Sequence, residues 1–339
     1  MNNHVDRPGF IIRLPSAHVV RSPAMIAGRS SAQQERCIDT MESNPILPRR
    51  RLGMELRRLR ELAGISTEEA AGALECSQSK ISRLETGKGV PRTRDVRDLI
   101  ALYGAPAESG SSELLRLAKD GQNTQAWWNS FRDVVQGDLL PDHLLRFVAL
   151  EQDSATILNC SPMLIPGLLQ TEGYVRAIAD VLGPTVDARD RDRFIQFRVK
   201  RQQVLHREPA PLEFKVLLCE SVALRRTIPA QTIIDQLLYL IKIVGDPRTR
   251  VEVKIVPLDA GFHRGLTGPF SVIHFADGAD QDVVYLEGAE GAVYLENPDI
   301  IKRYRKTFQA VESRALSVQE TKVRLMRIIE EHRRAGSQL

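Results

Sequence analysis

Residues 64–87 read GISTEEAAGALECSQSKISRLETG and contain two helix starts close together. Ser66, followed three residues later by Glu69, forms the pattern of a capping box, in which each residue satisfies a backbone N–H of the other. A three-residue break follows this second helix, and Ser77 then caps another helix that Gly87 ends. The stretch therefore predicts two short helices joined by a tight turn.

The residues just before this stretch predict the helix on which the pair packs. Leu52, Leu56, Leu59 and Ala63 recur at intervals of four, three and four residues, which is the spacing of one helical face. Gly64 is a natural C-terminal stop. Further short helices are expected up to about residue 118, so this part of the chain is predicted to be all-α.

The helix after Ser77 has two different faces. Ile81 and Leu84 point toward the first two helices, whereas the opposite face carries hydroxyl, amide and guanidinium groups. Such groups can bond base edges, since Arg pairs with guanine and Gln with adenine, although an ordinary solvated face would look similar. The predicted base-contacting residues are Gln78, Ser79, Ser82 and Arg83, and the predicted phosphate-contacting residues are Thr67, Lys80, Lys88 and Arg92.

Residues 64–71 and 77–87 resemble the helix-turn-helix of phage repressors and of the xenobiotic-response-element family. The resemblance implies a five-helix domain whose third helix enters the major groove of DNA. It also implies an ion pair between Arg60 and Glu85 that holds this helix in place. Glu75 departs from the family, which often has Gly there, so a left-handed backbone would cost roughly 1–2 kcal/mol. Thr67 replaces a common Gln and shortens the reach to phosphate.

The charge distribution agrees with a DNA-contacting first part. The chain has 339 residues, 47 Lys+Arg and 43 Asp+Glu, giving a net charge of +4. Residues 49–103 hold 12 of the basic and 8 of the acidic residues, so the whole excess lies there. A solvated basic face remains the alternative explanation. The length suggests two domains, and 42% hydrophobic residues exclude whole-chain disorder.

The predicted organisation is an all-α N-terminal helix-turn-helix domain joined to a mixed α+β C-terminal domain. Its expected parts are a flexible tail at 1–44, which could be an extension upstream of a start near Met41, the helix-turn-helix domain at 45–119 and the α+β domain at 120–335. The second domain is expected to form helices at 142–159, 167–182, 188–207, 230–244, 298–314 and 318–334, and strands at 213–219, 251–256, 269–275, 282–287 and 291–295. Gly288 and Gly291 mark a hairpin turn between the last two strands.

The sequence contains no catalytic motif that we recognise. It lacks a phosphate loop, a GxSxG nucleophile elbow and an HExxH zinc motif, and its seven histidines are scattered. The four cysteines form no CxxC pair, and the most apolar stretch, 232–244, is too short to span a membrane. We therefore expect a cytoplasmic protein that is not an enzyme and needs no metal or cofactor.

The second part of the chain resembles the C-terminal half of WhiJ-like, antitoxin-like regulators of actinobacteria over roughly residues 127–320. The resemblance implies a DNA-binding regulator that is often paired with a small partner protein. The matching pieces are Trp127-Trp128, Leu150-Glu151, the run from Pro166 to Glu172, Tyr174, Arg198, Arg201-Gln202, Glu220, Leu224-Arg225-Arg226, His263, Gly268-Pro269-Phe270, Tyr285-Leu286-Glu287 and Tyr294-Leu295-Glu296.

A ligand or partner site in this domain is a weaker expectation. Its candidate residues are Glu220, Arg225, Arg226, Tyr285 and Glu287, of which the first three follow an apolar strand whose end could face a pocket. A surface ion-pair network is the favoured alternative. Trp127-Trp128 and the leucines of Pro166–Leu169 are interpreted as packing residues, and the helix at 188–207, which mixes Asp with Arg, as a solvated one.

Three functions remain open from the sequence. The first is a transcriptional regulator that binds an inverted-repeat operator as a homodimer, with two contacting helices about 34 Å apart, and responds to a partner protein or ligand. The second is an antitoxin-like module that mainly binds a small partner protein and uses DNA binding for autoregulation. The third, an enzyme with an attached DNA-binding domain, is disfavoured by the missing motifs.

Overall fold

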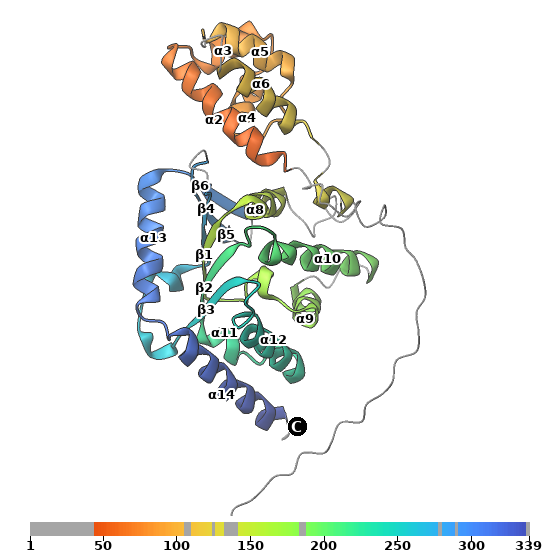
Figure 1. Cartoon of the computed structure of the whole chain (residues 1–339), viewed down its shortest axis with the longest axis vertical. Coiled ribbons are helices and arrows are strands. Elements are labelled where there is room, and N and C mark those ends of the chain that lie inside the picture. Colours follow the sequence, from red (N-terminus) through yellow and green to blue (C-terminus); the bar gives the residue numbers. More distant parts are fainter. Residues whose placement is uncertain are drawn as a thin grey trace, which may run out of the picture. The chain divides into compact units, whose positions relative to one another are not determined.

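The computed structural model describes residues 44–104, 110–123, 126–131, 142–182, 188–276, 280–288 and 291–336 (Figure 1). The expected tail, apart from Asn44, lies outside these residues. The described residues of the helical part form five helices, as predicted. These are α2 (Ile46–Leu62), α3 (Thr67–Ala73), α4 (Gln78–Glu85), α5 (Thr93–Leu102) and α6 (Gly110–Gly121).

The core of the helical part is built from the predicted apolar face of α2, except for Ala63, which follows the end of the helix and is exposed. Leu52, Leu56 and Leu59 are buried together with Ile81 and Leu84 of α4. Helix α2 approaches the C-terminal end of α4 closely at Gly53, where a Cβ atom would lie 2.4 Å from the backbone oxygen of Leu84. Glycine at this position therefore allows the two helices to meet.

A six-stranded mixed sheet organises the larger part of the chain. Its strands are β1 (Thr156–Ser161), β2 (Glu213–Cys219), β3 (Arg250–Val256), β4 (Phe270–His274), β5 (Val283–Gly288) and β6 (Gly291–Leu295). They lie in the order β3-β2-β1-β4-β5-β6. The first three are mutually parallel, and β4, β5 and β6 continue the sheet antiparallel. Gly288 pairs with Gly291, so the predicted hairpin between β5 and β6 is confirmed.

Helices cover both faces of this sheet. The α-helices are α8 (Asp142–Asp153), α9 (Glu172–Leu182), α10 (Ala188–Arg201), α11 (Glu220–Leu224), α12 (Ala230–Ile243), α13 (Pro298–Glu312) and α14 (Val318–Gly336). Short 3-10 helices lie at η2 (Trp127–Phe131), η3 (Gly167–Leu169), η4 (Gln202–His206), η5 (Leu258–Ala260) and η6 (Arg264–Thr267). Figure 1 shows α13 on one side of the strands and α9, α10 and α12 on the other.

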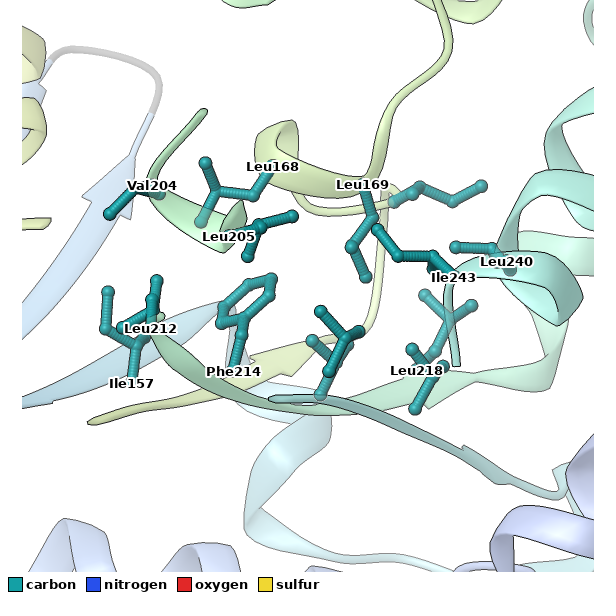
Figure 2. Close-up of a cluster of buried hydrophobic side chains, with 14 of the residues drawn as sticks. Ile157, Leu168, Leu169, Val204, Leu205, Leu212, Phe214, Leu218, Leu240 and Ile243 are labelled. Atoms are coloured by element: carbon teal, nitrogen blue, oxygen red, sulfur yellow. The ribbon is translucent and has the colours of Figure 1, made fainter. Parts of the chain in front are cut away.

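The two faces have separate apolar clusters. The larger one packs η3, η4 and α12 onto β1 and β2, with Leu169, Leu205, Phe214 and Leu240 almost fully buried (Figure 2). The smaller one packs α13 against the opposite face. Leu168, Leu169 and Trp128 belong to the larger cluster, so their interpretation as packing residues is confirmed.

The main error of the sequence-based prediction is the helix at 142–159. Helix α8 ends at Asp153, and residues 156–161 instead form β1, which lies between β2 and β4 in the sheet. The strand is specified by hydrogen bonding to both neighbours, and these lie far away in the sequence. The predicted helices at 167–182 and 188–207 are also interrupted, since η3 precedes α9 and η4 follows α10.

Candidate functional site

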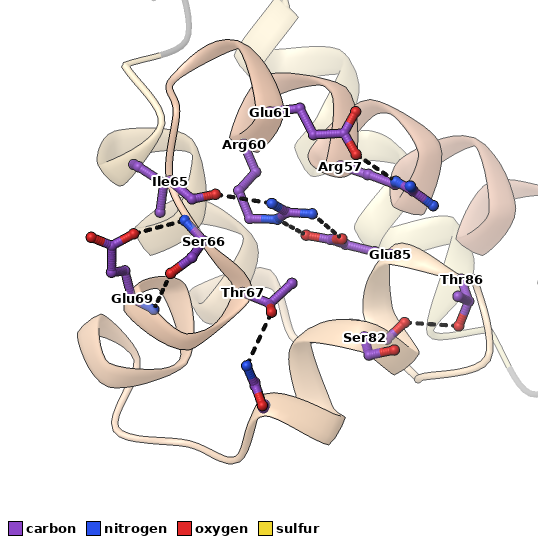
Figure 3. Close-up of polar contacts among 11 residues, drawn as sticks. Arg57, Arg60, Glu61, Ile65, Ser66, Thr67, Glu69, Ser82, Glu85 and Thr86 are labelled. Carbon is purple, nitrogen blue, oxygen red and sulfur yellow. Dashed lines mark hydrogen bonds and ion pairs between the residues drawn. The ribbon is translucent and has the colours of Figure 1, made fainter.

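The helix-turn-helix forms through the local interactions that its sequence predicts. The Ser66 hydroxyl accepts a hydrogen bond from the Glu69 backbone N–H (3.1 Å), and the Glu69 carboxylate accepts one from the Ser66 backbone N–H (2.7 Å), as Figure 3 shows. These bonds lower the pKa of Glu69. The turn contains Glu75 at φ 48°, the only non-glycine residue with positive φ in the described part of the chain. The expected left-handed conformation of Glu75 is therefore present.

Arg60 of α2 and Glu85 of α4 form the ion pair implied by the resemblance. The two nitrogen–oxygen distances are 2.6 and 2.9 Å, and a third guanidinium nitrogen donates to the Ile65 carbonyl oxygen at 2.9 Å (Figure 3). Both side chains are nearly buried, with 11% and 7% exposed. Burial and the neighbouring Glu85 charge raise the pKa of Tyr103 to about 12. A bidentate pair of this kind restricts the position and rotation of α4 relative to α2.

The predicted base-contacting side chains all lie on the exposed side of α4. Gln78, Ser79, Ser82 and Arg83 are exposed, whereas Ile81 and Leu84 are buried behind them. The Gln78 amide donates a hydrogen bond to the Thr67 hydroxyl at 3.2 Å, which links the starts of α3 and α4. The Arg83 guanidinium forms no ion pair with any residue that the structure describes. This face can therefore offer donors and acceptors to another molecule.

The predicted phosphate-contacting residues are placed less uniformly. Lys88 and Arg92 are exposed beyond α4, and Thr67 is half-buried. Lys80 instead forms an ion pair with Asp95 of α5 at 2.6 Å. Its charge is partly balanced within the fold, which weakens the case for a phosphate contact.

Some of the basic residues of 49–103 form ion pairs and hydrogen bonds within the fold. Arg50 is buried and lies 3.4 Å from the Glu296 carboxylate, and Arg51 pairs with the buried Asp280 at 2.5 Å. Arg49 donates to the Gly121 carbonyl oxygen. The charge count along the sequence therefore overstates the basic charge available to a ligand on the surface.

The candidate residues of the second domain do not form one group. Glu220 begins α11 and is buried, and its carboxylate accepts from the Leu258 backbone N–H and pairs with Arg324 of α14. Arg225 and Arg226 are exposed after that helix. Glu220 does line a cavity of about 560 Å³ at the end of the strand, together with Leu258 and Arg324, but Arg225 and Arg226 are not part of its wall.

Tyr285 and Glu287 line a cavity of about 670 Å³ elsewhere in the domain. The cavity is bounded by α8, α10, β5 and the segment 163–170, and its walls are largely apolar. Apolar lining residues include Phe147, Met163, Ile165, Val175, Phe194 and Phe214. Glu287 is exposed, whereas the Tyr285 hydroxyl is buried and has no hydrogen-bond partner.

Three arginines of α10, Arg191, Arg198 and Arg201, line this cavity, and the last two differ in their partners. Arg201 forms a buried bidentate pair with Glu151 of α8, at 2.5 and 2.7 Å. Arg198 has no carboxylate within ion-pair distance among the described residues, and its closest polar contact is Gln170 at 3.5 Å. Its guanidinium lies 4.8 Å from the centre of the Phe194 ring. Burial and the adjacent Arg201 lower the pKa of Arg198 to about 10, and burial raises the pKa of Glu151.

The segment around Gly167 passes directly over these arginines. A Cβ atom at Gly167 would lie 3.0 Å from a terminal nitrogen of Arg198 and 3.2 Å from one of Arg201. Buried glutamine side chains hold the segment in place, since Gln170 donates to Ile165 and Gln236 donates to Leu169. A larger residue at position 167 would therefore crowd both guanidiniums and require them to shift.

The interpretation of residues 188–207 as a solvated helix is wrong for its second half. Phe197 is fully buried and Arg201 is 7% exposed. Phe194, Arg198 and Arg201 follow one another at intervals of four and three residues, which places them on one helical face. That stripe was the available signal, and the Asp and Arg residues at the start of the helix obscured it.

The described residues contain neither a candidate membrane-spanning helix nor a candidate metal site. No helix there is long and apolar enough to cross a membrane. In the same ranges, no group of three or more His, Cys, Asp or Glu side chains is arranged to hold a metal ion.

Comparison with protein families matches both parts of the chain. A helix-turn-helix domain matches residues 51–109, and this match indicates DNA binding. A domain of unknown function, DUF5753, matches residues 144–327. Comparisons with curated proteins and with solved structures gave no significant match. Since the second match covers more than half of the 339 residues and follows a helix-turn-helix domain, the chain belongs to the DUF5753 family.

Proposed function

We propose that the protein is a sequence-specific transcriptional regulator that inserts α4 into the major groove of DNA. The observation that carries the proposal is the exposed face of Gln78, Ser79, Ser82 and Arg83 on a helix held by a nearly buried ion pair. We also propose that the protein acts in the cytoplasm and has no catalytic activity. It follows the resemblance to xenobiotic-response-element and WhiJ-like regulators.

The position of α4 suits base recognition because little has to be reorganised on binding. Arg60 and Glu85 hold the helix from behind, and Ile81 and Leu84 anchor it in the core. Arg83 is free to form the bidentate contact with guanine that arginine prefers. Lys88 and Arg92, beyond the end of the helix, are the best candidates for phosphate contacts, and Lys80 would have to exchange Asp95 for phosphate.

We further propose that the protein binds an inverted repeat as a homodimer. Two copies of α4 would then enter successive major grooves about 34 Å apart. The domain at 120–335 would provide the dimer contacts and respond to a partner protein or a small molecule. A change in the spacing of the two helices would alter affinity for the operator.

The test compares Arg83→Ala with Lys88→Ala in the full chain. Duplexes bound by the wild type are selected from a random pool, and affinities for the selected sequence and variants are measured over a range of salt concentrations. Arg83→Ala should relax the preference at one base position by roughly 1–3 kcal/mol. Lys88→Ala should weaken binding to all sequences alike. It should also reduce the slope of log affinity against log salt concentration by about one.

Arg116→Ala is the matched control, because Arg116 is exposed on α6 and pairs only with its helix neighbours Glu113 and Asp120. It should leave affinity and specificity unchanged. A uniform loss with both Arg83→Ala and Lys88→Ala would contradict the assignment of the base-contacting face. The absence of any selected sequence would contradict the proposed function itself.

An antitoxin-like binding module is the second candidate function, and an exposed apolar group supports it. Phe262 is 96% exposed, and Leu258 and Leu266 beside it in the sequence are exposed as well. Such side chains suit a protein partner. If neutralising a small protein encoded by a neighbouring gene is the main task, Phe262→Ser should abolish co-purification of the two proteins and leave DNA binding intact.

A further inference from the structure

We propose that the cavity beside α10 binds a small organic monoanion, a carboxylate attached to an apolar body, with Arg198 pairing with the carboxylate. The role of such a ligand as an effector of DNA binding rests on the proposed function. The binding of the ligand to the cavity does not rest on the proposed function.

The size and the walls of the cavity suit a small molecule. A volume of about 670 Å³ lies within the range of ligand-binding pockets. Phe147, Phe194 and Phe214 supply aromatic surface, and Ile165 and Val175 add aliphatic surface. Side chains of this kind bury an apolar body, whereas polar groups at a few positions set its orientation.

Arg198 is an arginine of the cavity that has no carboxylate within ion-pair distance among the described residues. The carboxylate of Glu151 neutralises Arg201 through two hydrogen bonds. Arg198 is half-buried, donates one long hydrogen bond to Gln170 and lies over the face of Phe194, and its Nε atom is buried without a partner among the described residues. A buried charge is costly unless it is paired and hydrogen-bonded. An anion entering the cavity would provide that partner.

A carboxylate fits this arrangement better than a phosphate. One unpaired guanidinium balances one negative charge, and Glu287 at the cavity wall would repel a second. The planar fork of arginine bonds both oxygens of a carboxylate at once. Tyr285 also lines the cavity, and its hydroxyl is buried without a partner among the described residues.

The backbone around Gly167 helps to position Arg198 for this contact. The lack of a side chain at Gly167 leaves room for a terminal nitrogen of each arginine next to the backbone. Phe194 covers Arg198 on another side. Such a restricted guanidinium loses little freedom when it binds an anion, which favours affinity.

The test uses titration calorimetry on the full chain without DNA. The three probes are naphthalene-2-carboxylate, the uncharged naphthalene-2-carboxamide and 2-naphthyl phosphate, which share one apolar body. The carboxylate should bind at least tenfold more tightly than the other two. Arg198→Met should weaken carboxylate binding by about tenfold to a hundredfold and leave carboxamide binding unchanged, since only the charge-assisted bonds are lost. Arg198→Lys should retain part of the affinity.

Thermal unfolding without ligand distinguishes ligand binding by Arg198 from a purely structural role of this residue. Because Arg198 is half-buried and has no ion-pair partner among the described residues, its removal relieves a desolvation cost, and Arg198→Met should melt no lower than the wild type. Arg189→Met, which removes an exposed arginine from the same helix, is the matched control and should change neither property.

Four results would overturn the proposal. These are equal binding of carboxylate and carboxamide, tighter binding of the phosphate, undiminished carboxylate binding by Arg198→Met, and no binding of the carboxylate up to about 1 mM. Arg83→Ala should bind the carboxylate like the wild type. A wild-type chain that binds the carboxylate but selects no DNA sequence would contradict only the proposed function.

Discussion

Each of the two parts of the molecule uses one bidentate arginine–glutamate pair to join two helices, but the pairs lie in different surroundings. Arg60 and Glu85 connect α2 to α4 near the surface of a small helical core. Arg201 and Glu151 connect α10 to α8 deep in the larger domain, where they are 7% and 2% exposed. The first pair supports a face that points outward, whereas the second lies beside a cavity that contains an unpaired arginine. Similar chemistry therefore lies behind an exposed face in one part and beside an internal cavity in the other.

The largest effect is expected from breaking the deeper pair. Glu151→Gln leaves the Arg201 charge buried without a counter-ion, so the free energy of unfolding should fall by about 3–5 kcal/mol. Urea unfolding of the full chain measures this loss. Glu151→Leu combined with Arg201→Met should recover most of it, because both charges are then removed. A loss below about 1 kcal/mol would show that solvent reaches the pair.

Breaking the Arg60–Glu85 pair should lower the free energy of unfolding by a smaller amount. Glu85→Gln keeps one hydrogen bond to the less buried Arg60, and we expect a loss of about 2 kcal/mol in the free energy of unfolding. DNA affinity should also fall, because α4 is no longer held in one orientation. Urea unfolding and DNA titration of the same sample measure both effects. A loss as large as that of Glu151→Gln would remove the contrast between the two pairs.

The Asp153 carboxylate has an amide partner instead of an arginine, and it should make the stability of the protein depend on pH. Asp153 accepts a hydrogen bond from the Asn44 side chain at 2.7 Å, and burial raises its pKa to about 6. Between its unfolded pKa, about 4, and about 6, the folded state binds more protons, so stability should fall as the pH rises through this window.

The Asp153→Asn variant tests this assignment. It should be more stable than the wild type at pH 7, by about 1–2 kcal/mol, and should lack this part of the pH dependence. Urea unfolding at pH 4, 5, 6 and 7 provides the measurement. An unchanged pH profile would mean that another group causes the slope.

The smallest effect is expected in the turn of the helix-turn-helix. Glu75 has a positive φ, which glycine adopts at little cost. Glu75→Gly should therefore raise the free energy of unfolding by about 0.5–1 kcal/mol, after allowing for the greater freedom of glycine in the unfolded chain. Thermal unfolding measures the gain. Glu68→Gly, at an exposed position inside α3, is the control and should destabilise by a similar amount.

Local signals made the helix-turn-helix predictable. The capping box of Ser66, the spacing of Leu52, Leu56 and Leu59, and the left-handed position of Glu75 all depend on residues a few positions apart. The exposed face of α4 followed from the same spacing. The partner of Lys80 was missed, because Asp95 is brought to it only by the packing of α5.

The larger domain was predicted less completely because its decisive contacts join distant segments. Strand β1 was assigned to a helix, since its pairing with β2 and β4 cannot be seen in residues 156–161 alone. Glu220 does lie at a cavity, but its partner there is Arg324 of α14, about a hundred residues later, and not Arg225 or Arg226.

The sequence by itself determined that this chain begins its described part with a helical DNA-binding unit and continues as a mixed domain, because capping, helical spacing and turn residues act over short distances. Only the tertiary structure decided which arginines are paired and which are not. Glu151 and Arg201 are fifty residues apart, and the backbone at Gly167 meets Arg198 only after α8, α10 and the sheet have packed. Burial and charge balance are properties of that packing, and so is the cavity.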